Sequence, residues 1–239
     1  MTTEQAYDTV DMMLNMGPQH PATHGVFRMV LTIDGERVVD VTPHIGYLHR
    51  GSEKLAENES YGQVVTLFDR LDYVSNLNNE LIFCRAAERL MGIEPPERGQ
   101  YIRVILAELN RLASHLLFIG TYAIDLGAMT PIMYGFRERE RIQNMFESVT
   151  GARMMHNFIR IGGVKEDVPP DFVPRVRALA DDVERGVQEC DRLLTFNEVF
   201  LARTRGIGVI DLPTALSCGL TGPSLRASGL AYDVRKDYP

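Results

Sequence analysis

The segment PPERGQYIRVILAELNRLASHLLFIGTYAIDLG, residues 95–127, carries the longest helical pattern in the chain. Its apolar residues recur every three or four positions, which places them on one face of an α-helix. Two prolines open the segment, where the first turn of a helix tolerates them, and Gly127 closes it. We therefore predict that it forms the core helix of a mainly helical protein. The predicted apolar face consists of Ile102, Ile105, Leu109, Leu112, Leu116 and Ile119.

Three further helices are predicted around this core helix, over residues 75–91, 130–151 and 171–194. Gly92 follows the first as a C-terminal cap, and Thr130-Pro131 begins the second. The run Arg137–Arg141 alternates in charge, which is typical of a face exposed to solvent or to a neighbouring chain. Glycines and a proline mark residues 220–229 as a loop. The apolar face of the helix over residues 75–91 is predicted to include Leu77, Leu81, Cys84 and Met91.

The N-terminal region shows a different period. Apolar residues alternate with others over residues 26–33, as in a β-strand. Asp34-Gly35 is a strong hairpin-turn signal, because both residues tolerate positive φ. Residues 36–41 then return as a second strand, which Pro43 ends. These features predict a β-hairpin.

A short helix is predicted after the hairpin, with Ser52 as its N-cap and an end near Asn58. The predicted fold class is therefore α+β and mainly α. Residues 1–60 form an N-terminal β region with a histidine loop, and residues 61–239 form a helical bundle.

The histidine loop is the stretch NMGPQHPATHG, residues 15–25. It places His20 and His24 four residues apart between prolines, which push the preceding residues out of the helical region. Gly17 and Gly25 permit positive φ at each end. We therefore expect a stiff loop and not a helical turn. Two imidazoles on such a loop suit proton delivery or ligand binding, although a purely structural turn with backbone-bonded histidines fits as well.

Composition narrows the class of protein. The chain has 239 residues, of which 45% are hydrophobic and 24% charged, and its net charge of −7 argues against non-specific nucleic-acid binding. Its three cysteines are widely spaced and form no CxxC, so neither a zinc finger nor a cysteine-ligated cluster is encoded, and a reducing compartment is favoured. Residues 1–11 show no signal peptide, and no stretch is apolar enough to span a bilayer.

Several motifs taken in order identify a resemblance that covers essentially the whole chain. They are GPQHPATHG (17–25), GYLHRGSEK (46–54), DRLDY (69–73), DLGAMTP (125–131), GAR (151–153), RIGGV (160–164), LTGPSLRASG (220–229) and YDVRK (232–236). In this order they resemble the D subunit of the respiratory NADH:quinone oxidoreductase, complex I. The resemblance implies the fold of the nickel–iron hydrogenase large subunit.

Two features of the chain depart from this family. Family members continue well past Pro239, and their C-terminal portion packs against these helices and helps to close the quinone site. Many members also carry a histidine where this chain has Met155, beside His156. We assign no proton-relay role to this position.

The resemblance implies a site for the quinone head group. In the family, the tyrosine and histidine that match Tyr73 and His24 approach one quinone carbonyl, and the carboxylate that matches Asp125 pairs with that histidine. His20, on the same loop, is a secondary candidate. Donors placed at a carbonyl stabilise the negative charge that develops on reduction, and histidine, with an ordinary pKa of about 6.5, releases a proton more easily than tyrosine at about 10.

A structural reading of the same residues remains open. Tyr73 fits an amphipathic core position, Asp125 a helix-end cap, and His24 a loop histidine that bonds to the backbone. Arg50 matches the family arginine that approaches the terminal cluster, whereas the plain alternative is a surface ion pair with Glu53.

The resemblance also implies an assembly. The chain binds no cofactor of its own, quinone is the substrate, and the partners are the complex I subunits B, C, H and I. The first of these carries the terminal [4Fe–4S] cluster, the membrane-embedded third one admits the quinone tail, and NAD and FMN react elsewhere. The complex would hold the chain peripherally, on the cytoplasmic side of the cell membrane, and would couple the reaction to proton translocation.

Three other functions come from different classes of protein. A catalytic hydrogenase subunit needs two CxxC pairs, which the chain lacks. A zinc site of the metalloprotease type needs His20 and His24 on one helix with a glutamate between them, and Pro21 and Ala22 stand there instead. A structural scaffold within the assembly differs only in making no head-group contacts.

Overall fold

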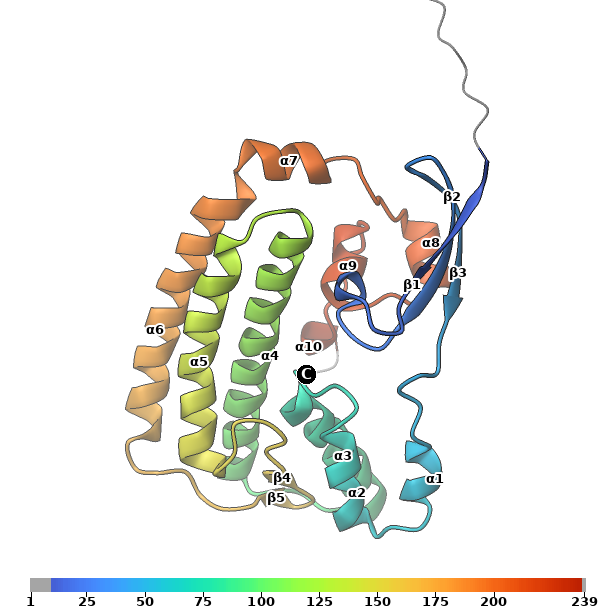
Figure 1. Cartoon of the computed structure of the whole chain (residues 1–239). Coiled ribbons are helices and arrows are strands. Elements are labelled where there is room, and N and C mark those ends of the chain that lie inside the picture. The colour runs from blue at the N-terminus through green and yellow to red at the C-terminus, as the bar shows by residue number, and fades with distance from the viewer. Residues whose placement is uncertain (1–9, 238–239) are drawn as a thin grey trace, which may run out of the picture. The chain divides into compact units, whose positions relative to one another are not determined.

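The computed structural model describes residues 10–237 as a mainly helical chain with two small antiparallel sheets (Figure 1). The expectation about a signal peptide concerns residues 1–11, most of which lie outside this range. The fold class α+β, mainly α, is confirmed. The helices are α1 (Ser52–Ala56), α2 (Tyr61–Phe68), α3 (Asn76–Met91), α4 (Glu97–Asp125), α5 (Thr130–Thr150), α6 (Phe172–Cys190), α7 (Glu198–Thr204), α8 (Leu212–Ser217), α9 (Gly222–Ala227) and α10 (Val234–Asp237), with a 3-10 turn η1 (Pro21–Thr23) and a π-helical turn η2 (Asp191–Thr195).

The described chain forms two compact units. The first contains residues 10–115 and 141–173, and the second contains residues 116–140 and 174–237. The predicted boundary near residue 60 stays a prediction. Among the described residues, no helix combines the length and the apolar character needed to cross a membrane.

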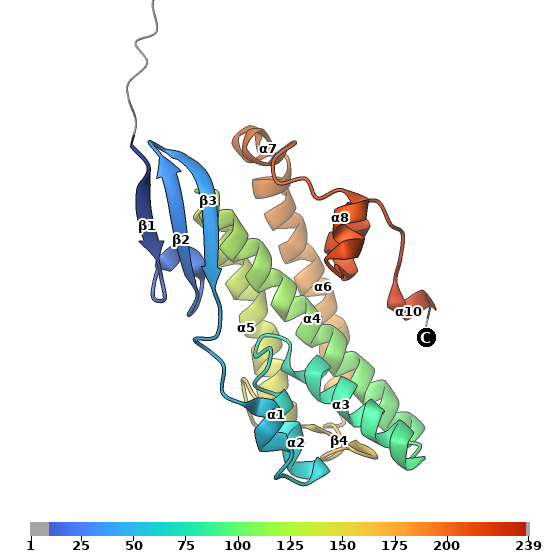
Figure 2. The same ribbon diagram turned by 90° about the vertical axis from the view of Figure 1, so that its right-hand side faces the viewer.

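The N-terminal sheet has three strands in the order β1 (Met12–Met16), β2 (Arg28–Asp34) and β3 (Arg37–His44), as Figures 1 and 2 show. The hairpin is confirmed, but its turn is Gly35-Glu36 and not Asp34-Gly35. Gly35 alone takes positive φ there, +60°, and a glycine in the first turn position suits the tight hairpin turn that needs positive φ only once.

Two further expectations about the sheet were wrong. Strand β1 was not predicted, because its sequence MMLNM is nearly all apolar and shows no alternation. Pro43 does not end β3 but pairs with Met29 inside it. The strand tolerates this proline because β3 lies at an edge of the sheet.

The predicted helices over residues 75–91, 95–127 and 130–151 are confirmed as α3, α4 and α5. Gly92, Gly127 and Gly151 follow them with positive φ, which ends each helix where an L-residue would be strained. The buried face of α3 differs from the predicted one, because Met91 is exposed and Glu80 and Glu88 are buried.

The first unit is built on a core in which α3, α4 and the second part of α5 meet a short hairpin of β4 (Ile159–Arg160) and β5 (Gly163–Val164). Arg103 of α4 is buried in this core, and its guanidinium binds both carboxylate oxygens of Glu88. The same guanidinium donates to the carbonyl oxygens of Arg160 and Gly163. It therefore ties α3 and the hairpin to α4. Fully buried apolar side chains of this core include Val65, Leu77, Leu106, Ile142, Phe146, Phe158 and Ile159.

In the second unit, the last part of α4, the first part of α5 and α6 run side by side (Figure 1). The expectation that the run Arg137–Arg141 faces outward was wrong for Glu138, which is 1% exposed and receives a hydrogen bond from Arg137. A run of five residues spans more than one helical turn, so it cannot lie on one face. A Cβ added at Gly186 of α6 would overlap the side chain of Glu138.

The C-terminal stretch of the second unit is more helical than predicted. Residues 222–227 form α9, although residues 220–229 were expected to be a loop. Helices α7, α8, α9 and α10 are all seven residues or shorter. Such short helices show too few turns for a helical period to be recognised in the sequence.

Candidate functional site

The histidine loop is a 3-10 turn, so the expectation that it contains no helical turn was wrong. Pro21 occupies the first position of η1, where proline is favoured. His20 precedes the turn in extended conformation, as its following proline requires, and its Nδ1 accepts a hydrogen bond of 3.2 Å from the amide of Ala22. Thr23 closes the turn by donating through Oγ1 to the carbonyl oxygens of His20 and Gly25.

His24 ends this turn in the left-handed conformation, with φ of +48°. The expected positive φ at Gly25 was wrong, since the residue before it takes that conformation, while Gly17 has φ of +101° as expected. A left-handed non-glycine residue is uncommon, and histidine is among the residues that adopt it more readily. The side chains of His20 and His24 are both exposed. The turn thus presents two imidazoles from its two ends.

Tyr73 lies in the turn of residues 69–75 that joins α2 to α3, and its side chain is 53% exposed. It is therefore not the core residue of the structural reading. The buried side chain of Asn110 on α4 holds the C-terminal end of this turn, since it donates to Val74 O and accepts from Leu77 N. The backbone around Tyr73 is fixed although its ring is accessible.

Asp125 is the last residue of α4 and belongs to the second unit, whereas His24 and Tyr73 belong to the first. Its side chain is exposed. The helix end beside it is closed by hydrogen bonds of 2.8 Å from Gly127 N to Ile124 O and from Ala128 N to Ala123 O. The predicted pairing of Asp125 with His24 stays a prediction.

Arg50 lies in the exposed loop between β3 and α1, and it forms no ion pair with Glu53 within the part of the chain that the structure describes. The residue that precedes α1 is Gly51, with φ of +66°, and it offers no side chain to cap this helix. The expectation that Ser52 is the N-cap was wrong, because Ser52 is already the first helical residue.

A buried polar cluster lies beneath the turn of Tyr73, and sequence reasoning missed it. Glu80 of α3 is fully buried, and its Oε2 accepts from the amides of Phe158, at 2.9 Å, and Ile159, at 2.7 Å. Burial and the neighbouring carboxyl of Asp69 raise the pKa of Glu80 to about 9. Asp69, which begins the turn of Tyr73, is 1% exposed.

His156 belongs to the same cluster, although the sequence gave no reason to assign it a role. Its ring is buried, lies 4.6 Å from the ring of Phe146 and bonds through Nδ1 to the amide nitrogen of Asn76. Burial lowers the pKa of His156 to about 4, so the ring is neutral at neutral pH. One signal for this cluster was present in the sequence, because Glu80 falls between Leu77 and Cys84 on the face of α3 that was predicted to be buried.

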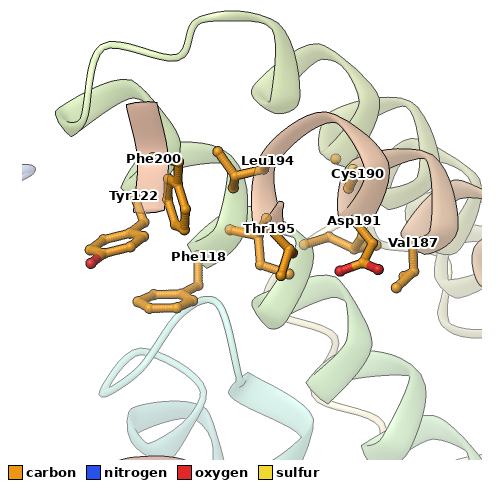
Figure 3. A pocket seen from close by; sticks show the side chains of 11 residues that line it. Phe118, Tyr122, Val187, Cys190, Asp191, Leu194, Thr195 and Phe200 are labelled. Carbon is orange, nitrogen blue, oxygen red and sulfur yellow. The ribbon is translucent and has the colours of Figure 1, made fainter. Parts of the chain in front are cut away.

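A separate pocket of about 200 Å³ lies within the second unit, between α4, α5, α6, η2 and α7 (Figure 3). The rings of Phe118, Tyr122 and Phe200 line one side, with Tyr122 5.6 Å from Phe118 and 6.2 Å from Phe200 between centroids. Cys190 and Asp191 line the other side. The pocket is smaller than an ordinary ligand site, and no histidine lines it.

Within residues 10–237, no three side chains of the metal-binding types His, Cys, Asp and Glu come together as a metal site. Cys84 and Cys190 are buried and Cys218 is exposed, and none forms a disulfide. Burial raises the pKa of Cys84 to about 12, so this thiol stays protonated and is a poor ligand at neutral pH.

Comparison with known proteins identifies the family. Residues 125–239 match the family described as respiratory-chain NADH dehydrogenase, 49 Kd subunit. The chain is 50% identical over 239 residues to the D subunit of the NADH-quinone oxidoreductase of Clostridium beijerinckii. It is 53% identical over 235 residues to the D 2 subunit of the same oxidoreductase in Rhizobium etli, and 53% identical over 228 residues to subunit 4 in Thermus thermophilus.

These matches cover 100%, 98% and 95% of this chain, and 65%, 58% and 56% of the three relatives in the same order. The chain therefore spans roughly three-fifths of the length of the relatives that it matches. It belongs to the family of respiratory-chain NADH dehydrogenase 49 Kd subunits, to which the D subunits of NADH-quinone oxidoreductases are assigned. The resemblance found in the ordered motifs is confirmed.

Proposed function

We propose that this chain forms the quinone head-group site of a proton-translocating NADH:quinone oxidoreductase, with His24 and Tyr73 as proton donors. The observation that carries the proposal is the geometry of Tyr73, whose exposed hydroxyl stands on a turn with a fixed backbone. A donor held in this way can meet a developing oxyanion without reorganising, which is the main source of electrostatic catalysis.

The histidine turn supplies donors of the right kind. Because Nδ1 of His20 accepts a hydrogen bond from Ala22, the proton of the neutral ring resides on Nε2. His20 therefore offers a defined N–H, and it is our secondary candidate for the head group. His24 is exposed at the other end of the turn, and an imidazole, which titrates near neutral pH, suits proton delivery.

Asp125 and Arg50 have proposed roles that follow from the family. Asp125 would orient His24 and keep its proton until electrons arrive, because a carboxylate beside an imidazole favours the protonated ring. Arg50 would face the terminal [4Fe–4S] cluster, which a neighbouring subunit carries. The family also implies the nickel–iron hydrogenase large-subunit fold, the neighbouring subunits B, C, H and I, and a peripheral position on the cytoplasmic side of the membrane.

NAD, FMN and the cluster would belong to partner subunits, and this chain supplies no thiolate set for a cluster, since its three cysteines form no CxxC. What its own residues would do is bind the head group, orient it and deliver protons to it. A purely structural scaffold is the second candidate, and it is favoured only if the head group touches none of these residues.

The substitution Tyr73→Phe in the assembled oxidoreductase tests the proposal. Loss of one donor to a developing oxyanion costs roughly 10²-fold in rate, and removal of an exposed hydroxyl leaves the fold intact. We expect quinone reduction to fall by about this factor while NADH oxidation with an artificial acceptor persists. Tyr101→Phe is the matched control, because Tyr101 is 65% exposed on α4. Equal quinone kinetics in both variants would favour the scaffold.

A further inference from the structure

The carboxyls of Asp69 and Glu80 lie against each other in the core of the first unit, close enough to hydrogen bond. They are 1% and 0% exposed. Both oxygens of Asp69 and Oε1 of Glu80 are buried without a donor among the described residues. Three buried acceptors without a donor are costly. One proton would convert one acceptor into a donor and satisfy the pair.

We propose that Asp69 and Glu80 share one proton at neutral pH, and that this proton positions the turn that carries Tyr73. The inference deepens the proposed function and rests on it only for the role of Tyr73. Glu80 and Asp69 are positioning residues in this account, since they act on the head group through Tyr73.

The hydrogen bonds of Glu80 show where the proton sits. Its Oε2 is occupied by the amides of Phe158 and Ile159, and an oxygen that accepts two amide bonds is the poorer base. The proton therefore resides on Oε1 and is donated to Asp69. In this arrangement the Glu80 carboxyl joins the start of β4 to the residue at which α2 ends.

The charged groups around the pair supply no compensating cation within residues 10–237. Asp69 is the charged group that acts directly on Glu80. His156, two residues before Phe158, is neutral because burial lowers its pKa. Cys84, one turn further along α3, senses Glu80 and also Arg103, Glu88 and Arg160. Arg103 is already bound to Glu88.

Loss of the proton would place two carboxylates together in the core. Their repulsion would act on Asp69, which begins the turn, while Asn110 holds the other end at Val74 and Leu77. The turn would then be held at one end only. We therefore expect Tyr73 to be positioned while the pair is protonated and to lose its position as the pair ionises.

Carbon-13 NMR of the full chain, labelled at the glutamate carboxyl carbons, tests the shared proton. We expect one glutamate to titrate near pH 9 while exposed glutamates titrate near their usual value of about 4.3. The signal should be absent in Glu80→Gln and should titrate at lower pH in Asp69→Asn. If all glutamates titrate below about pH 6, the inference is wrong. A shift of this signal on adding Mg²⁺ or Ca²⁺ would indicate a bound cation and would overturn it as well.

The pH dependence of folding gives a second readout. Glu80 has a raised pKa in the folded state, so its stabilising effect is complete below its ordinary pKa and is lost as pH rises through the folded value. The unfolding equilibrium constant of the wild type, divided by that of Glu80→Gln, should rise tenfold per pH unit inside this window. Glutamine keeps the acceptor for Phe158 and Ile159 and supplies a permanent donor to Asp69. A ratio that does not vary with pH would contradict a shared proton.

The link to Tyr73 is tested separately in the assembled oxidoreductase. The Michaelis constant for quinone should rise at alkaline pH in the wild type and stay constant over the same range in Glu80→Gln. If NMR shows the proton but the two enzymes have the same pH profile, the positioning role fails. If Tyr73→Phe itself has normal quinone kinetics, the proposed function fails while the proton assignment stands.

Discussion

Replacement of Arg103 by methionine should be among the most destabilising single changes in the first unit. Arg103 and Glu88 are only 3% and 5% exposed at their side chains. The guanidinium makes hydrogen bonds of 3.0 and 2.5 Å to the two oxygens of Glu88 and of 2.9 Å to Gly163 O. Methionine fills a similar volume but removes every donor, so Glu88 is left buried without its cation.

The expected loss is about 3–5 kcal/mol, the usual cost of removing one partner of a buried ion pair. This is a large share of the roughly 5–15 kcal/mol that stabilises an ordinary domain. Urea unfolding of the full chain should show the midpoint falling by roughly 1–2 M for a slope of about 2–3 kcal/mol per M. The double variant Arg103→Met with Glu88→Leu is the control, and it should lose less because no charge is left buried.

The acid limb of stability gives a further check on this pair. Arg103 and the amide of Gly162 lower the pKa of Glu88 although burial opposes them. A lowered pKa means that this stabilisation is present above the ordinary pKa and is lost as pH falls through the folded value. The limb should disappear in Arg103→Met. A loss below about 1 kcal/mol with an unchanged acid limb would refute the argument.

Two further substitutions test other parts of the account. Arg50→Met should lower the midpoint potential of the terminal cluster in the assembled enzyme by tens of millivolts, as expected for a charge interaction of roughly 1 kcal/mol; Arg37→Met, which removes a charge from the hairpin, should not, and equal potentials in both variants would place Arg50 away from the cluster. Gly186→Ala should destabilise the second unit by roughly 1–2 kcal/mol in urea unfolding, because overlap with Glu138 outweighs the better helix propensity of alanine; Gly62→Ala, with open space around it in α2, should instead stabilise by up to about 1 kcal/mol, and a stable Gly186→Ala would mean that Glu138 can move aside.

The long helices could be predicted because their signals are local. Apolar spacing marked α3, α4 and α5, and Gly92, Gly127 and Gly151 marked their ends. The signals failed where they were short or ambiguous. Strand β1 has no alternation, and helices α7 to α10 have too few turns to show a period.

The candidate site divides in the same way. The motifs named His24, Tyr73, Asp125 and Arg50, because these residues stand in contiguous, recognisable segments. The carboxyl pair of Asp69 and Glu80 could not be predicted, since the sequence does not state which acids are buried together. Likewise, the alternating charges around Glu138 suggested a solvated surface, and only the close approach of Gly186 shows that this acid is buried.

The most direct test of the account is to locate the quinone head group on this chain. We suggest photolabelling the assembled oxidoreductase with a quinone that carries an azide on its head group, followed by peptide mapping. The account predicts adducts within residues 17–25 and 69–75 that excess unlabelled quinone suppresses. Specific adducts confined to other segments or to other subunits would contradict the claim that this chain forms the head-group site.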